Sequence, residues 1–283
     1  MKKINVNGVN LAYKEFGSGN KILLSTQNFF FEDCHMELLG KPPYDYHVYL
    51  ITMRGYGESD HIYDSEPRDM VKVWGEDVLA FADAIGADKF YYTGVSHGCF
   101  AGWYIAFNYP HRLLGFAATS GICQFRPPMA DGNVPPRRRD IDWDRIVGNR
   151  EELAKMSWNT FEPTKDPERL ALREKRRQEH LEIMVNRKKE EFTVFNTGMS
   201  GSNAKTQEEF DKQLSEMDVP LLIINGVQDH LSTVEQALHV AKLVPGAKLI
   251  TYQHLGHAGP DECPALIARD CDRFFRDIEG RIL

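Results

Sequence analysis

The sequence lacks the features of a membrane-spanning or exported protein. Its 283 residues contain no run of about 18 apolar residues, the length that a membrane-spanning helix needs. The N-terminal segment Met1–Val6 also lacks the apolar core of a signal peptide. We therefore expect a cytoplasmic protein without a membrane partner.

Cysteine is scarce, and the five cysteines show no paired spacing of the kind found in metal sites or disulfide frameworks. We expect buried thiols in a reducing compartment, and Cys99 is predicted to be buried at a helix start rather than to act as a nucleophile. His254 and His257 lie in a Gly/Pro loop without a nearby third ligand, so neither a metal nor a cofactor is predicted. The cysteines are Cys34, Cys99, Cys123, Cys263 and Cys271.

An excess of basic residues is also absent, because 34 Lys and Arg stand against 41 Asp and Glu, a net charge of −7. Nucleic-acid binding needs a basic surface, so this balance argues against such a partner. The basic run Arg137–Arg139 is followed by Asp140, Asp142 and Asp144, which favours a solvated surface over an anion site. We expect a small-molecule substrate and leave open whether the chain forms a homodimer.

Strand-like and helix-like patterns alternate along much of the chain. Val71–Ile85 and Asp261–Ile278 carry apolar residues at helical spacing, and short apolar runs typical of strands lie between such segments. This alternation predicts an α/β fold with a doubly wound, mostly parallel sheet of about eight strands. The predicted strands are Lys3–Val6, Asn10–Glu15, Ile22–Ser25, Val48–Thr52, Phe90–Thr93, Gly115–Thr119, Leu221–Asn225 and Lys248–Tyr252.

Residues 126–218 differ in composition from the rest of the chain. They hold 18 Lys or Arg and 19 Asp or Glu, so 37 of 93 positions are charged, against 38 of the other 190. Apolar residues at helical spacing within 181–185 favour amphipathic helices over disorder. We therefore predict a core of residues 1–125 and 219–283, with a helical cap of residues 126–218 inserted after the sixth strand.

A Gly-x-Ser-x-Gly segment, Gly94 to Gly98, follows the strand Phe90–Thr93 and precedes a helical stretch, Cys99–Asn108. Such a turn presents its serine, here Ser96, at the tip of a tight bend, because a side chain at either glycine would crowd the turn. The helix dipole favours negative charge near this serine. Because the pattern is short, it indicates a nucleophile only together with a general base and an acid.

Two later segments contain a suitable base and acid. Asp229 follows the buried apolar strand Leu221–Asn225, and His257 lies in the Gly/Pro-rich loop after Lys248–Tyr252. A serine hydroxyl is activated by a general base that an acid orients, so these residues complete the expected set. The alternative for Asp229 is a turn residue or a helix N-cap, because hydroxyl residues and a predicted helix follow it.

The order Ser96, Asp229, His257, with each residue after a strand, resembles that of the α/β-hydrolase family. Met53–Ser59 is similar to the family's Arg-Gly-x-Gly-x-Ser loop, and Asn108–Arg112 is similar to the Pro-x-Arg that ends the helix behind the nucleophile. The resemblance covers most of the chain and implies the α/β-hydrolase fold. It also implies that Ser96 is the nucleophile, His257 the general base and Asp229 the acid that orients the imidazole.

The family resemblance further implies an oxyanion hole made of two backbone amides. One is the amide of the residue after the nucleophile, here His97. The other comes from the loop after the third strand, where relatives show His-Gly and this chain reads Gln27-Asn28-Phe29. The resemblance therefore implies the amide of Asn28 or Phe29, and the absence of glycine restricts the backbone of this loop.

Aromatic residues follow the same loop. Phe30 and Phe31, together with Trp158 of the charged segment, are predicted to line a substrate pocket. The alternative for the phenylalanines is packing beneath the cap.

These residues favour a serine hydrolase that cleaves a carboxylic ester or lactone of a small molecule through an acyl-enzyme. The resemblance also allows a C–C bond hydrolase or an aminopeptidase, and the atypical oxyanion loop allows a weakly catalytic ligand-binding receptor. Epoxide hydrolases and haloalkane dehalogenases of this fold use a carboxylate nucleophile. That chemistry is excluded, because serine would form an inert ether with an alkyl carbon.

Overall fold

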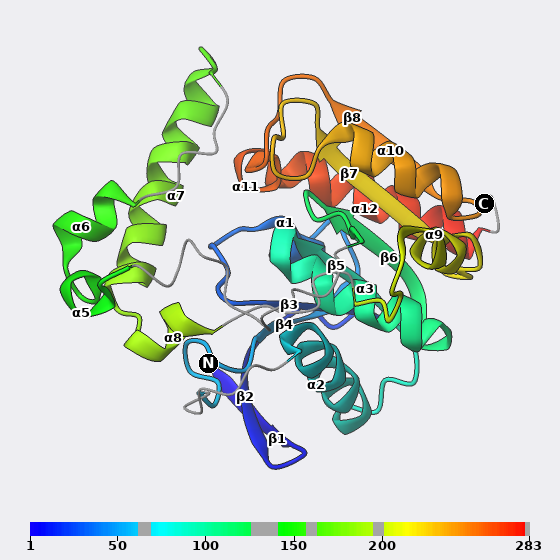
Figure 1. Cartoon of the computed structure of the whole chain (residues 1–283), viewed down its shortest axis with the longest axis horizontal. Helices are drawn as coiled ribbons and strands as arrows, with labels where there is room; N and C mark the ends of the chain where they lie inside the picture. Colours follow the sequence, from blue (N-terminus) through cyan, green and yellow to red (C-terminus); the bar gives the residue numbers. More distant parts are fainter. Residues whose placement is uncertain (62–68, 126–140, 157–162, 195–200, 281–283) are drawn as a thin grey trace.

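The centre of the molecule is an eight-stranded sheet in the order β1-β2-β4-β3-β5-β6-β7-β8 (Figure 1). The structure is a computed structural model that describes residues 1–61, 69–125, 141–156, 163–194 and 201–280. The strands are β1 (Lys2–Val6), β2 (Val9–Phe16), β3 (Lys21–Gln27), β4 (Tyr46–Thr52), β5 (Phe90–Val95), β6 (Leu113–Thr119), β7 (Leu221–Gly226) and β8 (Lys248–Tyr252).

All eight predicted strands are present, and the predicted α/β sheet is confirmed. β1 and β2 pair antiparallel with their neighbours, whereas the strands from β4 to β8 pair in parallel. The chain passes from β3 to β4 on one side and then to β5 on the other side of β3. The carboxyl ends of β3 and β5 therefore border the crevice where α/β sheets place their ligands.

Helices cover both faces of the sheet, which explains why its central strands read as continuous apolar runs. Leu23 and Leu24 are both fully buried, yet they belong to hydrophobic clusters on opposite faces. The first face is covered by α2 (Met70–Ala84), α3 (Cys99–Asn108) and α10 (Val234–Leu243). The second face is covered by α1 (His35–Leu39) and α12 (Pro264–Glu279).

The described residues between β6 and β7 form five helices. α5 to α8 stand to one side of the sheet in Figure 1 and share a small apolar cluster around Ile146, Leu153 and Phe192. α9 instead packs on the main core through Phe210 and Leu214. The helices are α5 (Trp143–Ile146), α6 (Arg150–Lys155), α7 (Pro167–Val185), α8 (Lys189–Thr193) and α9 (Gln207–Ser215).

Helical structure is thus present in the charged segment, and the division into core and cap at residues 126 and 218 stays a prediction. The basic run Arg137–Arg139 lies outside the described residues. Within the described ranges, no helix is long and apolar enough to cross a membrane. Cys99 is buried as the first residue of α3, as predicted.

The loop after β4 is held by an ion pair that is largely removed from water. Arg54 contacts both carboxylate oxygens of Asp77 on α2, and the Asp77 side chain is 6% exposed. Burial raises the pKa of Asp77, and Arg54 opposes this rise. Trp74 also donates from its indole nitrogen to the Arg54 carbonyl oxygen at 3.1 Å. The loop is therefore fixed to α2 by both the backbone and the side chain of Arg54.

Replacing this cation should destabilise the fold at neutral pH. We expect Arg54→Met to lower the free energy of unfolding by about 3 kcal/mol, because it leaves the Asp77 carboxylate buried without a partner. Urea unfolding at pH 7 measures this loss. The double variant Arg54→Met/Asp77→Asn should recover most of it, and a double variant as unstable as the single one would contradict the assignment.

Candidate active site

Ser96 occupies a sterically crowded turn between β5 and α3. The turn is the short 3₁₀ helix η1 (Ser96–Gly98), and Ser96 adopts a left-handed φ of 51°. A Cβ atom on Gly94 would lie 2.6 Å from the carbonyl group of Gly98, and one on Gly98 would lie 2.8 Å from the Gln27 side chain. Backbone atoms therefore exclude a side chain at Gly94, whereas a side chain at Gly98 would require the Gln27 side chain to move.

Asp229 lies in a turn directly after β7. Its backbone amide donates to the Gly226 carbonyl oxygen at 3.1 Å, and its Oδ1 accepts from the backbone amides of Leu231 and Ser232, both at 2.9 Å. The N-cap of α10 is Thr233. Asp229 is thus a turn residue, and its carboxylate is oriented by two backbone amides.

The structure brings the three predicted residues together in a hydrogen-bonded chain. His257 Nε2 lies 2.9 Å from Ser96 Oγ, and His257 Nδ1 lies 2.9 Å from Oδ2 and 3.1 Å from Oδ1 of Asp229. The residues come from loops after β5, β8 and β7, which are separated by up to 161 positions in the sequence. His257 and Asp229 are both buried, so water competes little for these contacts.

Two cavities meet at Ser96 and His257. The first has a volume of about 220 Å³ and is lined by Asp261 and by Phe30 and Phe31, whose role in a substrate pocket stays a prediction. The second, of about 240 Å³, is bordered by Phe100, Ile122, Leu231 and others. Trp158, also predicted for the pocket, lies outside the described residues.

The loop after β3 contacts the residue that follows Ser96. The backbone amide of Asn28 donates to Nε2 of His97 at 3.4 Å. Burial, assisted by the charge of Arg187, lowers the pKa of His97 to about 4, so its ring is neutral at pH 7 and can accept this bond. In the sequence, His97 is notable because it directly follows Ser96. That position does not predict the hydrogen bond from Asn28 to the His97 ring.

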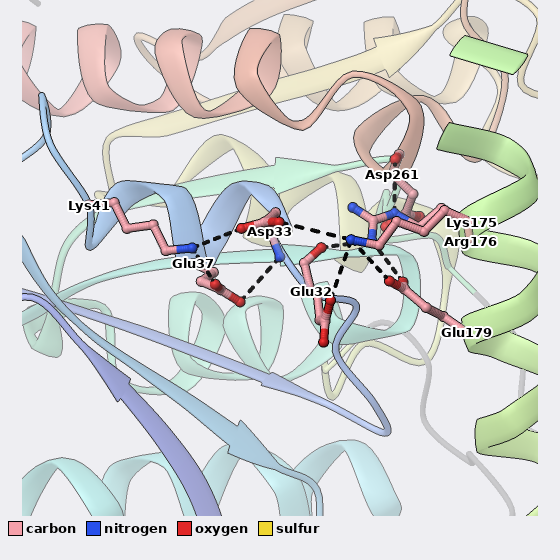
Figure 2. A network of polar contacts seen from close by, with 8 residues as sticks. All are labelled: Glu32, Asp33, Glu37, Lys41, Lys175, Arg176, Glu179 and Asp261. Carbon is pink, nitrogen blue, oxygen red and sulfur yellow. Dashed lines mark hydrogen bonds and ion pairs between the residues drawn. The ribbon is translucent and has the colours of Figure 1, made fainter. Parts of the chain in front are cut away.

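Helix α7 reaches the same region through Arg176, whose side chain is 1% exposed (Figure 2). The guanidinium donates to the carbonyl oxygens of Glu32 at 2.7 Å and Asp261 at 3.3 Å, and to the Glu179 carboxylate at 2.8 Å. It also lies over the Phe31 ring, 4.8 Å from its centroid. Arg176 therefore joins α7 to the loop after β3 and to α11 (Gly259–Glu262).

A second group of arginines holds α7 on α11, just after His257. Arg169 and Arg173 both donate to Oε2 of Glu262, whose side chain is completely buried. Arg169 also donates to the His254 carbonyl oxygen at 3.1 Å. These contacts fix the loop that carries His257 to the helical segment between β6 and β7.

Asp261 is a site residue that sequence reasoning missed. It is 6% exposed and lies on the wall of the first cavity. Burial raises the pKa of its carboxyl group to about 7, although the charges of Arg176 and His257 oppose the rise. Its sequence signal, an acidic residue four positions after His257 at the start of a helix, resembles an ordinary helix terminus.

The described residues of this region do not form a recognisable metal site. Among the residues that the structure describes, no three His, Cys, Asp or Glu side chains are grouped so that they could hold a metal ion. The polar side chains next to Ser96 contact one another through hydrogen bonds, as the pairs of His257 with Ser96 and Asp229 show.

Comparison with known proteins identifies the family. The profile of the alpha/beta hydrolase fold family matches residues 24–264, and the chain therefore belongs to this family. None of the curated proteins with which the sequence was compared matches it.

Solved structures of enzymes share the fold at low sequence identity. The enol-lactonase from Burkholderia xenovorans is 18% identical with a TM-score of 0.70, and the match covers 97% of this chain and 100% of that chain. A thermophilic esterase from Thermogutta terrifontis is 18% identical with a TM-score of 0.68 (98% and 99% covered). A meta-cleavage product hydrolase from Pseudomonas fluorescens is 17% identical with a TM-score of 0.66 (98% of each).

The raised pKa of Asp261 has a consequence for stability. An unfolded aspartate ionises near pH 4, so between about pH 4 and 7 the folded protein binds a proton that the unfolded chain has lost. Stability therefore falls as the pH rises through this window. We expect Asp261→Asn to be more stable than the wild type by on the order of 3 kcal/mol above pH 7, with a smaller gain at pH 5.

Urea unfolding at several pH values measures this difference. The exposed Asp218→Asn is the matched control, and we expect it to change stability little at any pH. A gain for Asp261→Asn that is the same at pH 5 and pH 8 would contradict the assigned pKa.

Proposed function

We propose that this protein is a serine hydrolase that cleaves a carboxylic ester or lactone of a small molecule through an acyl-enzyme. The observation that carries the proposal is the continuous hydrogen-bonded chain from Ser96 through His257 to Asp229. Family membership supports hydrolase chemistry, and several similar structures are those of esterases and lactonases. The cytoplasmic location stays part of the proposal.

In the proposed reaction the Ser96 hydroxyl attacks the ester carbonyl while His257 Nε2 takes its proton. His257 then protonates the leaving alcohol, and the acyl group remains on Ser96. Water attacks this acyl-enzyme with His257 again as general base, which releases the acid and restores the hydroxyl. Asp229 holds Nδ1 protonated throughout and stabilises the imidazolium.

The tetrahedral intermediates need donors for the oxyanion. We assign them to the backbone amides of His97 and Phe29. Of the two alternatives in the loop after β3, Phe29 is favoured, because the amide of Asn28 already donates to the His97 ring at 3.4 Å. The His97 ring therefore acts on the loop as an acceptor that fixes its position, without a role in proton transfer.

The segment of residues 126–218 is proposed to act as a cap, with α7 beside the first cavity. Arg176 on α7 contacts Phe31, and the Phe29 ring lies 5.4 Å from the His180 ring of the same helix. The phenylalanines thus contact α7 and also line the cavity. Both interpretations of the aromatic run are compatible with these contacts, and the pocket role of Phe30, Phe31 and Trp158 is part of the proposal.

Removing the nucleophile tests the proposal directly. We expect Ser96→Ala to lower kcat for short p-nitrophenyl esters by at least about 10³-fold, and a fluorophosphonate to label the wild type at Ser96 alone. Ser25→Ala is the matched control, since Ser25 is buried in β3 and its Oγ has no hydrogen-bond partner among the described residues. Full esterase activity in Ser96→Ala would overturn the assignment.

An isosteric substitution tests the proposed role of Asp229 as the acid that orients His257. We expect Asp229→Asn to lower kcat by about 10⁴-fold with a small change in KM, because an amide in this place favours the wrong tautomer of His257. Steady-state kinetics measure the split, and circular dichroism checks that the fold is retained. A loss confined to KM would show that Asp229 acts in binding instead.

A further inference from the structure

The first cavity, beside Ser96, is lined by both apolar and polar residues. Phe29, Phe30 and Phe31 lie on its apolar side, and Asp261 is one of the polar residues that line it. A cavity of about 150 Å³ holds a benzene molecule, so the 220 Å³ here can receive a substituent of similar or somewhat larger size. It opens to Ser96, so a group bound in it belongs to the molecule that is being cleaved.

The Asp261 carboxyl group makes no hydrogen bond and no ion pair with any residue that the structure describes, although Asp261 is only 6% exposed. The backbone of Asp261 is fixed separately: its amide donates to the Ala258 carbonyl oxygen at 2.9 Å, and its carbonyl oxygen accepts from Arg176. Neither carboxyl oxygen is among the fully enclosed side-chain atoms without a partner, so the carboxyl group keeps some accessible surface. It can therefore accept a hydrogen bond from a ligand that enters the cavity.

The charges nearby favour a neutral donor over a cation as that ligand. The buried guanidinium of Arg176 lies beside Asp261, and the charge of Arg187 helps to lower the pKa of both His97 and His180, which line the same cavity. An ammonium group would meet the charge of Arg187 and that of Arg176, which its ion pair with Glu179 partly offsets. A substrate carboxylate would instead face the acidic side chain of Asp261 at close range.

We propose that this cavity binds a hydroxyl-bearing part of the substrate and that the Asp261 carboxyl group accepts the hydrogen bond from that hydroxyl. The inference rests on the proposed hydrolase function and adds the substrate class. Removal of the Asp261 carboxyl group is therefore expected to change the selectivity among esters.

The selectivity depends on the charge of the carboxyl. A carboxylate is a stronger acceptor than a carboxylic acid, so preference for the hydroxyl group rises as the pH increases through about 7. The ratio of two esters measured at each pH cancels the pH dependence that both reactions share. The other titratable or charged groups near this carboxyl are Cys34 before α1, Arg176 and Glu179 on α7, His257, and Glu262 on α11.

The experiment compares kcat/KM for p-nitrophenyl 3-hydroxybutyrate, butyrate, 3-methoxybutyrate and 3-aminobutyrate, and for 3-hydroxyphenyl and phenyl acetate. The second set places the hydroxyl group on the alcohol side of the ester. We expect the wild type to prefer the hydroxyl compound about tenfold in at least one set. Asp261→Leu should lose the preference, so that kcat/KM for the hydroxyl ester and for butyrate become equal within about threefold. Asp261→Asn retains an acceptor and should show a weaker preference that does not change with pH.

Several outcomes would overturn the proposal. They are equal rates for hydroxyl, methoxy and unsubstituted esters in the wild type, a faster reaction of the amino ester, an unchanged preference in both variants, or an equal loss on all esters in the variants. Asp261→Asn keeps the size of the side chain, so the test holds if the leucine variant does not fold. Ser96→Ala separates the two proposals: if it retains activity, the hydrolase mechanism fails whatever the selectivity of Asp261.

Discussion

Space is tightly restricted where β5 ends, and the candidate site depends on this restriction. Ser96 takes a left-handed conformation, Gly94 lies against the carbonyl of Gly98, and Gly98 lies against the side chain of Gln27. The nucleophile turn and the end of β3 are therefore packed closely against each other. Because the hydrogen bond from Asn28 to His97 spans the same two segments, the loop after β3 is aligned with the serine without the glycine that relatives use there.

The second constraint is electrostatic and comes from α7. This helix is rich in charge, yet Arg173 and Arg176 are buried. Their guanidinium groups meet acceptors on two other segments, the loop after β3 and α11, so one helix controls the relative positions of both. The cavity that Asp261 lines lies at this junction, and the phenylalanines after β3 line it as well.

The sheet and the Ser96, Asp229 and His257 arrangement were predictable because their signals are local. A buried parallel strand reads as a short apolar run, and Ser96 and Asp229 each follow one. His257 follows β8, a half-buried strand with a Gly/Pro-rich loop after it. The contacts of Arg176 and Glu262 are different in kind, since the partners lie 85 to 144 residues apart and no pattern in the sequence connects them. High charge in residues 126–218 predicts solvated helices, whereas the fold uses part of that charge inside the molecule.

The shared acceptor Glu262 also determines how the molecule responds to salt. Ion pairs on a protein surface are screened within about 10 Å at 0.1 M salt, whereas buried pairs are screened much less. The carboxylate of Glu262 is fully enclosed by Arg169 and Arg173 and their surroundings. Moderate ionic strength therefore leaves the contact between α7 and α11 intact, and α7 stays on the loop that carries His257.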